Sequence, residues 1–373
     1  MIIGVLKEIK AGENRIALSP AGVRSLRLDG HRVLVETDGG SGSGFSNDDY
    51  AAEGAGICTA GDIYGKAELI VKVKEPLEEE WPLYRKGQVL FTYLHLASSE
   101  ALTRWLLEKK IVGIAYETVE DRDGLLPLLT PMSEVAGRMS VQLAARFLEK
   151  TWGGRGILLS GVPGVPPAEV VILGGGIAGV NAAKVAVGQG AHVTILDVRH
   201  ERLKYIDDIF HGTVITLYSN PYMIEKATGY ADVLIGAVLI TGARAPVLVT
   251  EDMVCRMKPG SVIVDISIDQ GGSVETIRPT THADPIYTLH NVIHCGVPNI
   301  PAAVPRTSTF ALTNATLPYI RAIADKGLRQ AALENDAIAC GINCAAGKLI
   351  HPAVAAAFGM DNAPWHEVLP LKF

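Results

Sequence analysis

The stretch EVVILGGGIAGVNAAKVAVGQGAHVTILD, residues 169–197, decides the fold of the region that contains it. It opens with an apolar, β-branched run at residues 170–173, which is typical of a strand covered on both faces. Small and apolar residues at helical spacing follow, and a second apolar run at residues 192–196 leads to Asp197. A strand, a helix and a second strand in about 30 residues predict a βαβ unit with parallel strands.

Three glycines between the first strand and the helix have the spacing G-x-G-x-x-G: Gly174, Gly176 and Gly179. The first permits a tight turn, the second lets the backbone approach a pyrophosphate, and the third lets the helix pack closely on the strand. The N–H groups at the start of the helix would then point at the phosphates. Because the strands and the acidic residue occur in the expected places, we interpret these glycines as a dinucleotide-binding turn. A purely structural glycine turn is the alternative.

The residue at the end of the second strand indicates which dinucleotide is bound. Asp197 can accept hydrogen bonds from an adenosine ribose, and its negative charge would repel a 2′-phosphate. Two nearby cations, Arg199 and Arg202, weaken this discrimination. The sequence therefore predicts NAD, in preference to NADP, as the cofactor.

Length and composition bound the remaining possibilities. A chain of 373 residues with 48% hydrophobic and 20% charged residues is typical of a globular protein of two domains. The net charge of −6 and the lack of a dense Lys/Arg block argue against nucleic acid as a partner. No apolar run approaches the ~18 residues of a membrane span, and the N-terminus has no signal-peptide pattern. The five cysteines are scattered. Cys340 and Cys344 could share a helix face, but buried free thiols are expected in preference to metal ligands or a disulfide, in a soluble cytoplasmic protein.

Alternating strands and helices also fill the N-terminal part, which has no glycine fingerprint. We expect strands at residues 2–6, 31–36, 69–73, 89–94 and 111–116, and helices at 20–29, 47–53 and 99–109. Ser19 and Pro20 form a typical start for the first helix. Such βα alternation predicts a second parallel sheet covered by helices. We interpret this part as the substrate-binding partner of the nucleotide domain.

The rest of the chain extends the nucleotide domain and then returns to the first. A long helix at 131–150 connects the domains, and a Gly/Pro-rich loop follows at 153–167. We expect strands at 214–218, 233–238, 262–266 and within 286–297, and helices at 201–210, 222–228, 251–257 and 307–324. A helical tail through residue 358 would pack on the first domain. The predicted fold is α/β, with two Rossmann-like parallel-sheet domains separated by a cleft and joined by long helices. Residues 1–130 with 306–373 form the substrate domain, and residues 131–305 form the NAD-binding domain.

Ligands of parallel α/β sheets bind beyond the carboxyl ends of the strands, so polar residues there are candidates for chemistry. Lys74 follows a predicted strand and, with period 2, shares a face with Lys72. It can bind a substrate carboxylate or carbonyl, or it can simply face solvent. His95 ends the run VLFTYLH and can transfer protons near neutral pH, whereas a structural histidine is the alternative.

Two further candidates come from other segments. Asp269 follows a strand at the rim of the nucleotide domain and could face the nicotinamide, or could be a turn residue. Asp265, within that strand, is expected to be buried. Arg15 lies in the connection GENRIALSP, and its planar guanidinium suits a carboxylate, although most loop arginines face water.

Several longer segments resemble one family along essentially the whole chain. They are KEIKAGENRIALSPAGV, LIVKVKEP, LFTYLHLA, IAYETV and PMSEVAGRMS in the first part, and GGRGILLSGVPGV, VVILGGGIAGVNAA, VIVDISIDQGG and VPRTSTFALTNAT in the second. With these segments the chain resembles the NAD-dependent L-alanine dehydrogenases, a family that is itself similar to the NAD-binding part of transhydrogenases. The resemblance implies reversible oxidative deamination of L-alanine with NAD and water to pyruvate, ammonium and NADH.

The resemblance also implies roles for individual residues. His95 and Asp269 would be the catalytic acid/base groups, and Arg15 and Lys74 would hold the substrate beside Tyr93 and Met132. The cofactor would be bound by Gly174, Gly176, Gly179, Asp197, Arg202, Ser219, Ser133 and Asn299. Arg202 stands where the family often has lysine, and Ile300 where it often has methionine. Family members are typically homohexamers, so a homo-oligomer with small-molecule substrates is expected.

Two other functions fit parts of the pattern. The NAD-binding component of a proton-translocating transhydrogenase has a similar first domain but, as a family, lacks the LHLA and PMSEVAGR segments present here. A non-catalytic NAD sensor would be expected to have lost Lys74, His95 or Asp269, and this chain has all three. Saccharopine or opine dehydrogenase activity on a related scaffold is a further alternative, because the sequence does not give the size of the pocket.

Overall fold

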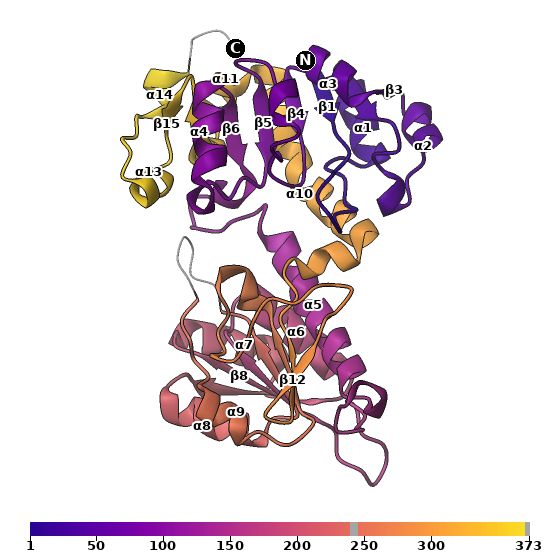
Figure 1. Ribbon diagram of the computed structural model, residues 1–373, viewed down its shortest axis with the longest axis vertical. Helices are drawn as coiled ribbons and strands as arrows, with labels where there is room; N and C mark the ends of the chain where they lie inside the picture. The colour runs from indigo at the N-terminus through magenta and orange to yellow at the C-terminus, as the bar shows by residue number, and fades with distance from the viewer. Residues whose placement is uncertain (239–244, 370–373) are drawn as a thin grey trace. The chain divides into compact units, whose positions relative to one another are not determined.

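A computed structural model describes residues 1–238 and 245–369 and divides the chain into two compact units (Figure 1). Unit 1 consists of Met1–Met132 and Val304–Phe373, and unit 2 of Ser133–Ala303. Each unit has a central sheet with flanking helices, which confirms the predicted α/β class. Within the described ranges, no helix combines the length and the apolar character needed to span a membrane.

The sheet of unit 1 has eight strands in the order β15-β14-β6-β5-β4-β1-β2-β3. Its first six strands along the chain pair in parallel, whereas β14 pairs antiparallel with β6 and with β15. The strands are β1 (Ile2–Val5), β2 (Arg32–Glu36), β3 (Gly56–Cys58), β4 (Leu69–Val71), β5 (Val89–Thr92), β6 (Val112–Ala115), β14 (Ile342–Ala345) and β15 (Lys348–Leu349). The order β3-β2-β1-β4-β5-β6 is that of a doubly wound sheet, with a switch point between β1 and β4.

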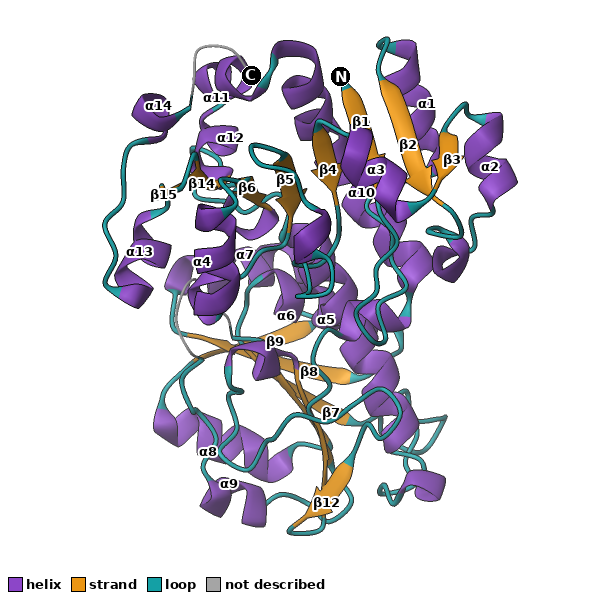
Figure 2. Ribbon diagram, turned by 45° about the horizontal axis from the view of Figure 1, so that its top comes forward, coloured by secondary structure: helices purple, strands orange, loops and turns teal. Residues whose placement is uncertain are grey.

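Helices cover this sheet because their apolar stripes match its buried strands. One buried core joins the strands to α3 (Ala60–Lys66), α4 (Glu100–Glu108) and α13 (Pro352–Phe358), and Figure 2 shows α3 and α4 among these strands. The predicted start of α1 (Pro20–Leu28) is confirmed, since the Ser19 side chain accepts a hydrogen bond from the Gly22 N–H at 3.3 Å. The remaining helices of unit 1 are α2 (Asn47–Ala52), α10 (Pro305–Lys326), α11 (Leu328–Glu334), α12 (Asp336–Gly341) and α14 (Trp365–Val368).

Part of unit 1 differs from the sequence prediction. β3 and α3 were not predicted, and the prediction of an all-helical tail was wrong because β14 and β15 extend the sheet there. These strands have two to four residues, too few to show a period. Cys340 and Cys344 therefore do not share a helix face: Cys340 lies exposed in α12, and Cys344 is buried in β14.

The sheet of unit 2 has seven strands in the order β12-β13-β11-β10-β7-β8-β9, parallel except for β12. They are β7 (Glu169–Leu173), β8 (His192–Asp197), β9 (Val214–Tyr218), β10 (Val233–Gly236), β11 (Val262–Asp265), β12 (Tyr287–Leu289) and β13 (Val292–Cys295). The helices are α5 (Thr130–Phe147), which begins in unit 1, α6 (Ile177–Gly188), α7 (His200–Phe210), α8 (Pro221–Tyr230) and α9 (Glu251–Cys255). The predicted βαβ unit is confirmed as β7, α6 and β8, and the switch point lies between β7 and β10.

Candidate functional site

In unit 1 the candidate residues lie just beyond the carboxyl ends of β1, β4 and β5. Parallel strands end at the same edge of a sheet, so the loops after them meet there. Arg15 belongs to the connection after β1, Lys74 follows β4, and His95 follows β5. The structure thus brings these three candidates to the same edge of unit 1.

Arg15 is held by a buried carboxylate that the sequence analysis did not select. The Glu13 side chain accepts hydrogen bonds from Arg15 Nε at 2.7 Å and from Nη2 at 2.6 Å, and both residues are buried. Burial by itself would lower the pKa of Arg15, but the hydrogen bonds and charge of Glu13 raise it. Arg15 Nη1 lies 3.0 Å from the Met132 sulfur, so the predicted substrate residues Arg15 and Met132 are in contact.

The two lysines after β4 have different surroundings. The strand ends at Val71, so the predicted period-2 relation between Lys72 and Lys74 does not apply. Lys72 is fully buried and forms ion pairs with Glu80 and, at 3.6 Å, with Glu8. Among the described residues, no side chain forms a hydrogen bond or ion pair with the half-buried Lys74 ammonium. Burial and the nearby Arg15 guanidinium lower the pKa of Lys74.

Glu8, which follows β1, binds both the Lys72 ammonium and the backbone next to it. Its carboxylate accepts hydrogen bonds from the backbone N–H groups of Val73 at 2.6 Å and Lys74 at 3.3 Å, across the β1/β4 switch point. Burial raises the pKa of Glu8, against the opposing effect of Lys72. The backbone that carries Lys74 is therefore fixed by a buried network of charges.

His95 lies in a left-handed turn, with φ 48° and ψ 39°, immediately before a 3-10 turn at Leu96–Ser98. Its ring is parallel to that of Tyr93, with centroids 5.9 Å apart, and the Tyr93 hydroxyl donates to the Leu128 carbonyl at 2.7 Å. The imidazole is about half exposed and lines a pocket of about 200 Å³ that Glu75 and Trp81 also line. His95 is therefore accessible to a small solute.

The glycine turn of unit 2 leaves no room for side chains at two of its three predicted positions. A Cβ on Gly174 would lie 2.5 Å from the Ala237 carbonyl oxygen, and Gly174 has a φ of +102°. A Cβ on Gly179 would lie 1.9 Å from the Gly174 carbonyl oxygen. A Cβ on Gly176, the N-cap of α6, would meet nothing within 4 Å. The turn thus presents open space to the N-terminus of a 12-residue helix, which is the arrangement that binds a phosphate group.

Asp197 and Arg202 both act on this turn. One Asp197 oxygen accepts the Gly175 N–H at 2.8 Å, and the other accepts the Arg199 N–H at 2.8 Å. The Arg202 guanidinium donates two hydrogen bonds to the Gly175 carbonyl, at 3.0 and 2.7 Å. Arg202 therefore clamps the glycine turn, a role that the sequence did not reveal.

Two serines are further cofactor candidates of unit 2. Ser219 follows β9 and donates its backbone N–H to the Asp197 carbonyl at 3.0 Å, whereas Ser133 lies in α5.

Asp269 is exposed and accepts the backbone N–H of Asn299 at 3.2 Å, so these two candidates are in contact. Asn299 has a φ of +55°. Asp265 is buried, as predicted, and its carboxylate accepts hydrogen bonds from Ser267 and Ser273. The structure thus forms two groups in unit 2, one around Asp197 and one around Asp269.

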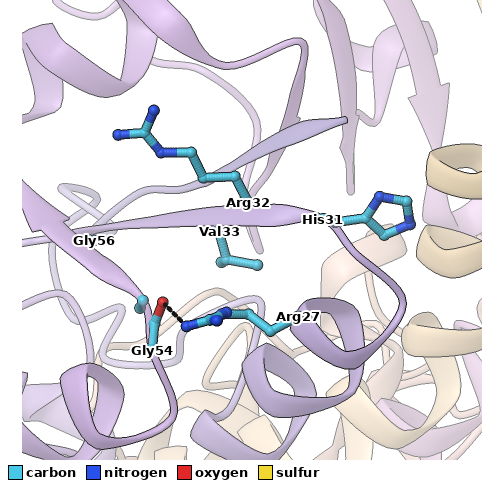
Figure 3. Close-up of a pocket in the computed structure, with 7 residues that line it drawn as sticks. Arg27, His31, Arg32, Val33, Gly54 and Gly56 are labelled. Carbon is cyan, nitrogen blue, oxygen red and sulfur yellow. Dashed lines mark hydrogen bonds between the residues drawn. The ribbon is translucent and has the colours of Figure 1, made fainter.

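A pocket of about 370 Å³ also occurs elsewhere in unit 1, beside β2 (Figure 3). Arg27 and Arg32 line it, and Arg27 donates a hydrogen bond to the Gly54 carbonyl at 3.1 Å. His31 is engaged by the N-terminal amine and by Asp325. None of the predicted site residues lines this pocket.

Sequence reasoning missed the acidic partners of the candidate cations. Glu8, Glu13 and Glu117 each bind a candidate residue or its backbone in unit 1, and Glu80 binds Lys72, two residues before the candidate Lys74. Of these four, only Glu117 could have been selected from the sequence. It comes directly after a predicted strand at residues 111–116, as Lys74 and His95 come directly after theirs. The others lie in loops, where spacing does not indicate a partner.

Both units match models of one protein family. Residues 4–136 match the model described as Alanine dehydrogenase/PNT, N-terminal domain, and residues 140–352 match Alanine dehydrogenase/PNT, C-terminal domain. The chain belongs to the alanine dehydrogenase/PNT family. This membership confirms the resemblance predicted from the sequence segments.

Similar proteins extend over the whole chain. An alanine dehydrogenase of Methanococcus maripaludis is 58% identical over 371 residues, covering 99% of this chain and 100% of the relative. One of Geobacillus stearothermophilus is 56% identical over 99% of this chain and 100% of its own length. A solved L-alanine dehydrogenase has a TM-score of 0.93 and 54% identity, covering 96% of this chain and 99% of its own. A transhydrogenase of Sinorhizobium meliloti shares the fold, with a TM-score of 0.81 at 24% identity over 95% of this chain and 100% of its own.

Proposed function

We propose that this chain is an L-alanine dehydrogenase, which converts L-alanine, NAD and water to pyruvate, ammonium and NADH, and catalyses the reverse amination. Full-length identity of 55–58% to proteins named alanine dehydrogenase supports this function. The transhydrogenase match is limited to 24% identity and supports a shared fold only.

The observation that carries the proposal is the meeting of two cations at one edge of unit 1. Because β1 and β4 are parallel neighbours, the connections that carry Arg15 and Lys74 leave the same edge of the sheet. Burial lowers the pKa of Lys74, and repulsion by the Arg15 charge adds to this lowering. A bound carboxylate would relieve that repulsion and accept hydrogen bonds from both. Alanine and pyruvate each have a carboxylate next to the reacting carbon, so Arg15 and Lys74 would hold the substrate beside Tyr93 and Met132.

The residues of unit 2 fit NAD. The glycine turn, Gly174 to Gly179, and the N-terminus of α6 would bind the pyrophosphate, because added side chains are excluded at Gly174 and Gly179. Asp197 would bind the adenosine ribose, with Arg202 and Ser219 nearby. Ser133 and Asn299 would approach the nicotinamide, which accepts a hydride from the substrate Cα when bound.

Proton transfer is assigned to His95 and Asp269. In the oxidative direction the substrate becomes an iminium, and water attacks its carbon. His95 would take the proton from that water and return one to the leaving ammonia. Asp269 would orient the water or ammonia. Arg15 and Lys74 keep the substrate carboxylate fixed during these steps, which supplies the required orientation.

The family resemblance supports a homohexamer that works in the cytoplasm on small molecules, in amino-acid catabolism. Sedimentation of the purified protein would test the oligomeric state: a species of six chains supports the hexamer, and a stable monomer or dimer contradicts it. This assembly is proposed by likeness to the family.

The experiment that tests the function is NADH formation by purified protein with NAD and L-alanine at alkaline pH. NADP, D-alanine, L-serine and glycine serve as controls. Turnover confined to L-alanine and NAD would support the proposal. Tight NADH binding without turnover would overturn it in favour of a sensor or a transhydrogenase component, and turnover with a bulkier amino acid would overturn the choice of substrate.

A further inference from the structure

The carboxylate of Glu117 lies against the turn that carries His95. Glu117 belongs to a 3-10 turn at Tyr116–Thr118, directly after β6, and its side chain is 16% exposed. Because β5 and β6 are parallel neighbours, with Thr92 paired to Ala115, their following residues lie side by side. The end of β6 thus faces the turn after β5.

Both N–H groups at the start of that turn point to the same carboxylate. The His95 N–H donates to Glu117 Oε1 at 2.5 Å, and the Leu94 N–H lies 3.2 Å from each oxygen. Successive N–H groups of a left-handed turn form a concave site for an anion, and here a side chain of the same unit supplies the anion. Glu117 Oε1 also lies 3.9 Å from His95 Nδ1.

The turn needs such a partner because His95 adopts a conformation that is costly for a residue with a Cβ. Its φ of 48° lies in the left-handed region, where glycine is favoured. Ser98 supports the other side of the turn, through its hydroxyl and its N–H, which both donate to the His95 carbonyl. The conformation of His95 is therefore fixed from its N–H by Glu117 and from its carbonyl by Ser98.

The other groups around Glu117 do not replace it. His351, the N-cap of α13, lies near enough for Glu117 and Glu120 to oppose the lowering of its pKa by burial, and α13 packs against the 3-10 turn after His95. Glu120 is exposed. Tyr116 packs edge-on against Tyr93, whose ring stacks on His95. Among the described residues, Glu117 alone accepts a side-chain hydrogen bond from the His95 N–H.

We propose that Glu117 is a positioning residue: its carboxylate holds the left-handed turn that presents the His95 imidazole to the substrate. This inference rests on the proposed function, in which His95 transfers protons. Loss of the carboxylate frees two N–H groups and lets the turn relax, so the imidazole moves from its working position. A displacement of about 1 Å can lower a rate by about 100-fold.

The test compares Glu117→Ala, Glu117→Gln and the control Glu120→Gln, all in the full-length protein. We expect kcat to fall by about 100-fold in Glu117→Ala and by about tenfold in Glu117→Gln, whose amide oxygen still accepts one N–H. The dissociation constant of NADH, which depends on unit 2, is expected to stay within about twofold, and Glu120→Gln is expected to match wild type. Unchanged kcat in Glu117→Ala would overturn the proposal.

A double-mutant cycle separates positioning of His95 from a general structural role. In a His95→Ala background the imidazole is absent, so adding Glu117→Ala should lower kcat by less than about twofold further. A full additional 100-fold loss would show that Glu117 acts elsewhere, and would overturn the inference. The cycle measures kcat, and urea unfolding of all four proteins shows that the chain remains folded.

A crystal structure of Glu117→Ala gives a readout that does not depend on turnover. We expect His95 to leave the left-handed region or its ring to shift, whereas an unchanged His95 contradicts the proposal. If wild type proves inactive on alanine while His95 still moves in the variant, the proposed function fails and the positioning role stands. If wild type is active and His95 does not move, only the positioning role fails.

Discussion

The two units run their parallel strands in the same order but fill the crevice at the switch point differently. Unit 2 places a glycine turn there, where Gly174 and Gly179 exclude side chains. Unit 1 places buried charges at the corresponding point between β1 and β4, where Glu8 accepts hydrogen bonds from the backbone N–H groups of Val73 and Lys74. One crevice is therefore built from backbone and the other from ionised side chains.

This difference has a physical basis in the ligands that the proposal assigns to each unit. A pyrophosphate is bound by N–H groups at a helix N-terminus, and these need only a close approach of the backbone. A small carboxylate substrate needs cations at fixed positions, and a buried cation needs carboxylates around it. Unit 1 accordingly contains Glu13 beside Arg15 and Glu80 beside Lys72.

The largest effect is expected for Lys72→Ala in unit 1. Removing the Lys72 ammonium leaves Glu8 and Glu80 buried without their shared cation, and breaking such a pair costs about 3–5 kcal/mol. The free energy of unfolding, measured in urea, should fall by that amount. The control Lys86→Ala changes an exposed lysine of the same unit and should be within about 0.5 kcal/mol of wild type. Equal stability of both variants would mean that the Lys72 network does not stabilise unit 1.

Lys74 lies only two residues from Lys72, but Lys74→Ala should lower catalytic activity and leave the stability of the chain nearly unchanged. Lys74→Ala loses no side-chain partner among the described residues. It removes the cost of burying the ammonium but also loses the packing of the side-chain methylenes, so it should unfold at nearly the wild-type urea concentration. Its kcat/KM for L-alanine should fall by about 100- to 1,000-fold, because a fixed cation at the substrate is lost. Steady-state kinetics beside the urea curves check both parts. A large loss of stability with intact kcat/KM would reverse the roles assigned to the two lysines.

In unit 2 the strongest test of the glycine turn is Gly179→Ala. The added Cβ would lie 1.9 Å from the Gly174 carbonyl, so either α6 or the turn must shift. Overpacking of this kind costs about 1–3 kcal/mol, so we expect the dissociation constant of NADH to rise by about tenfold to 100-fold. Gly188→Ala, at the far end of α6 with nothing within 4 Å of its Cβ, is the matched control. Fluorescence titration with NADH measures both, and equal affinities would contradict a tight turn.

The contrast between a turn built from backbone in unit 2 and a network of charged side chains in unit 1 also explains which features could be predicted from the sequence. The glycine turn, β7, α6 and β8 were readable because a backbone requirement appears as glycines at fixed spacing beside long apolar periods. The candidate cations of unit 1 were selected from their positions after strands and from family resemblance. Their partners were not, because Glu13 and Glu80 lie in connections where no period applies and where charge alone usually indicates solvent. The short strands β3, β14 and β15 were missed for a related reason. A strand of two to four residues is too short to show a period, and its formation depends on the neighbouring strands of the sheet.

Asp197→Ser should change cofactor selectivity moderately. The variant removes the charge that would repel a 2′-phosphate, while Arg199 remains nearby. It also loses an acceptor of the Gly175 N–H, so NAD binding should weaken as NADP binding improves. We expect the ratio of kcat/KM for NAD to that for NADP to fall by about tenfold, or about 1.4 kcal/mol. Asp207→Ser, on the following helix, is the control, and an unchanged ratio would show that Asp197 only holds the turn.

The smallest effect is a pH dependence of stability that comes from Lys74. Burial and Arg15 lower its pKa below the ordinary 10.5, so the unfolded chain keeps this proton at pH values where the folded chain has released it. In that window the unfolded state binds more protons, and stability therefore rises with pH. Below the folded pKa both states are charged, and the cost of burying the ammonium is present in full. Above 10.5 both are neutral and that cost is gone.

Lys74→Met removes this titration, so the variant should be more stable than wild type near neutral pH, with a difference that shrinks as the pH rises toward 10.5. The change should be about 1.4 kcal/mol for each pKa unit of lowering. Urea unfolding of both proteins at matched pH values measures it, and exposed Lys86→Met corrects for an ordinary lysine. A difference that stays constant with pH would mean that the Lys74 ammonium is well solvated. The unfavourable burial that prepares unit 1 for an anionic substrate would then be absent, and the contrast with the uncharged turn of unit 2 would weaken.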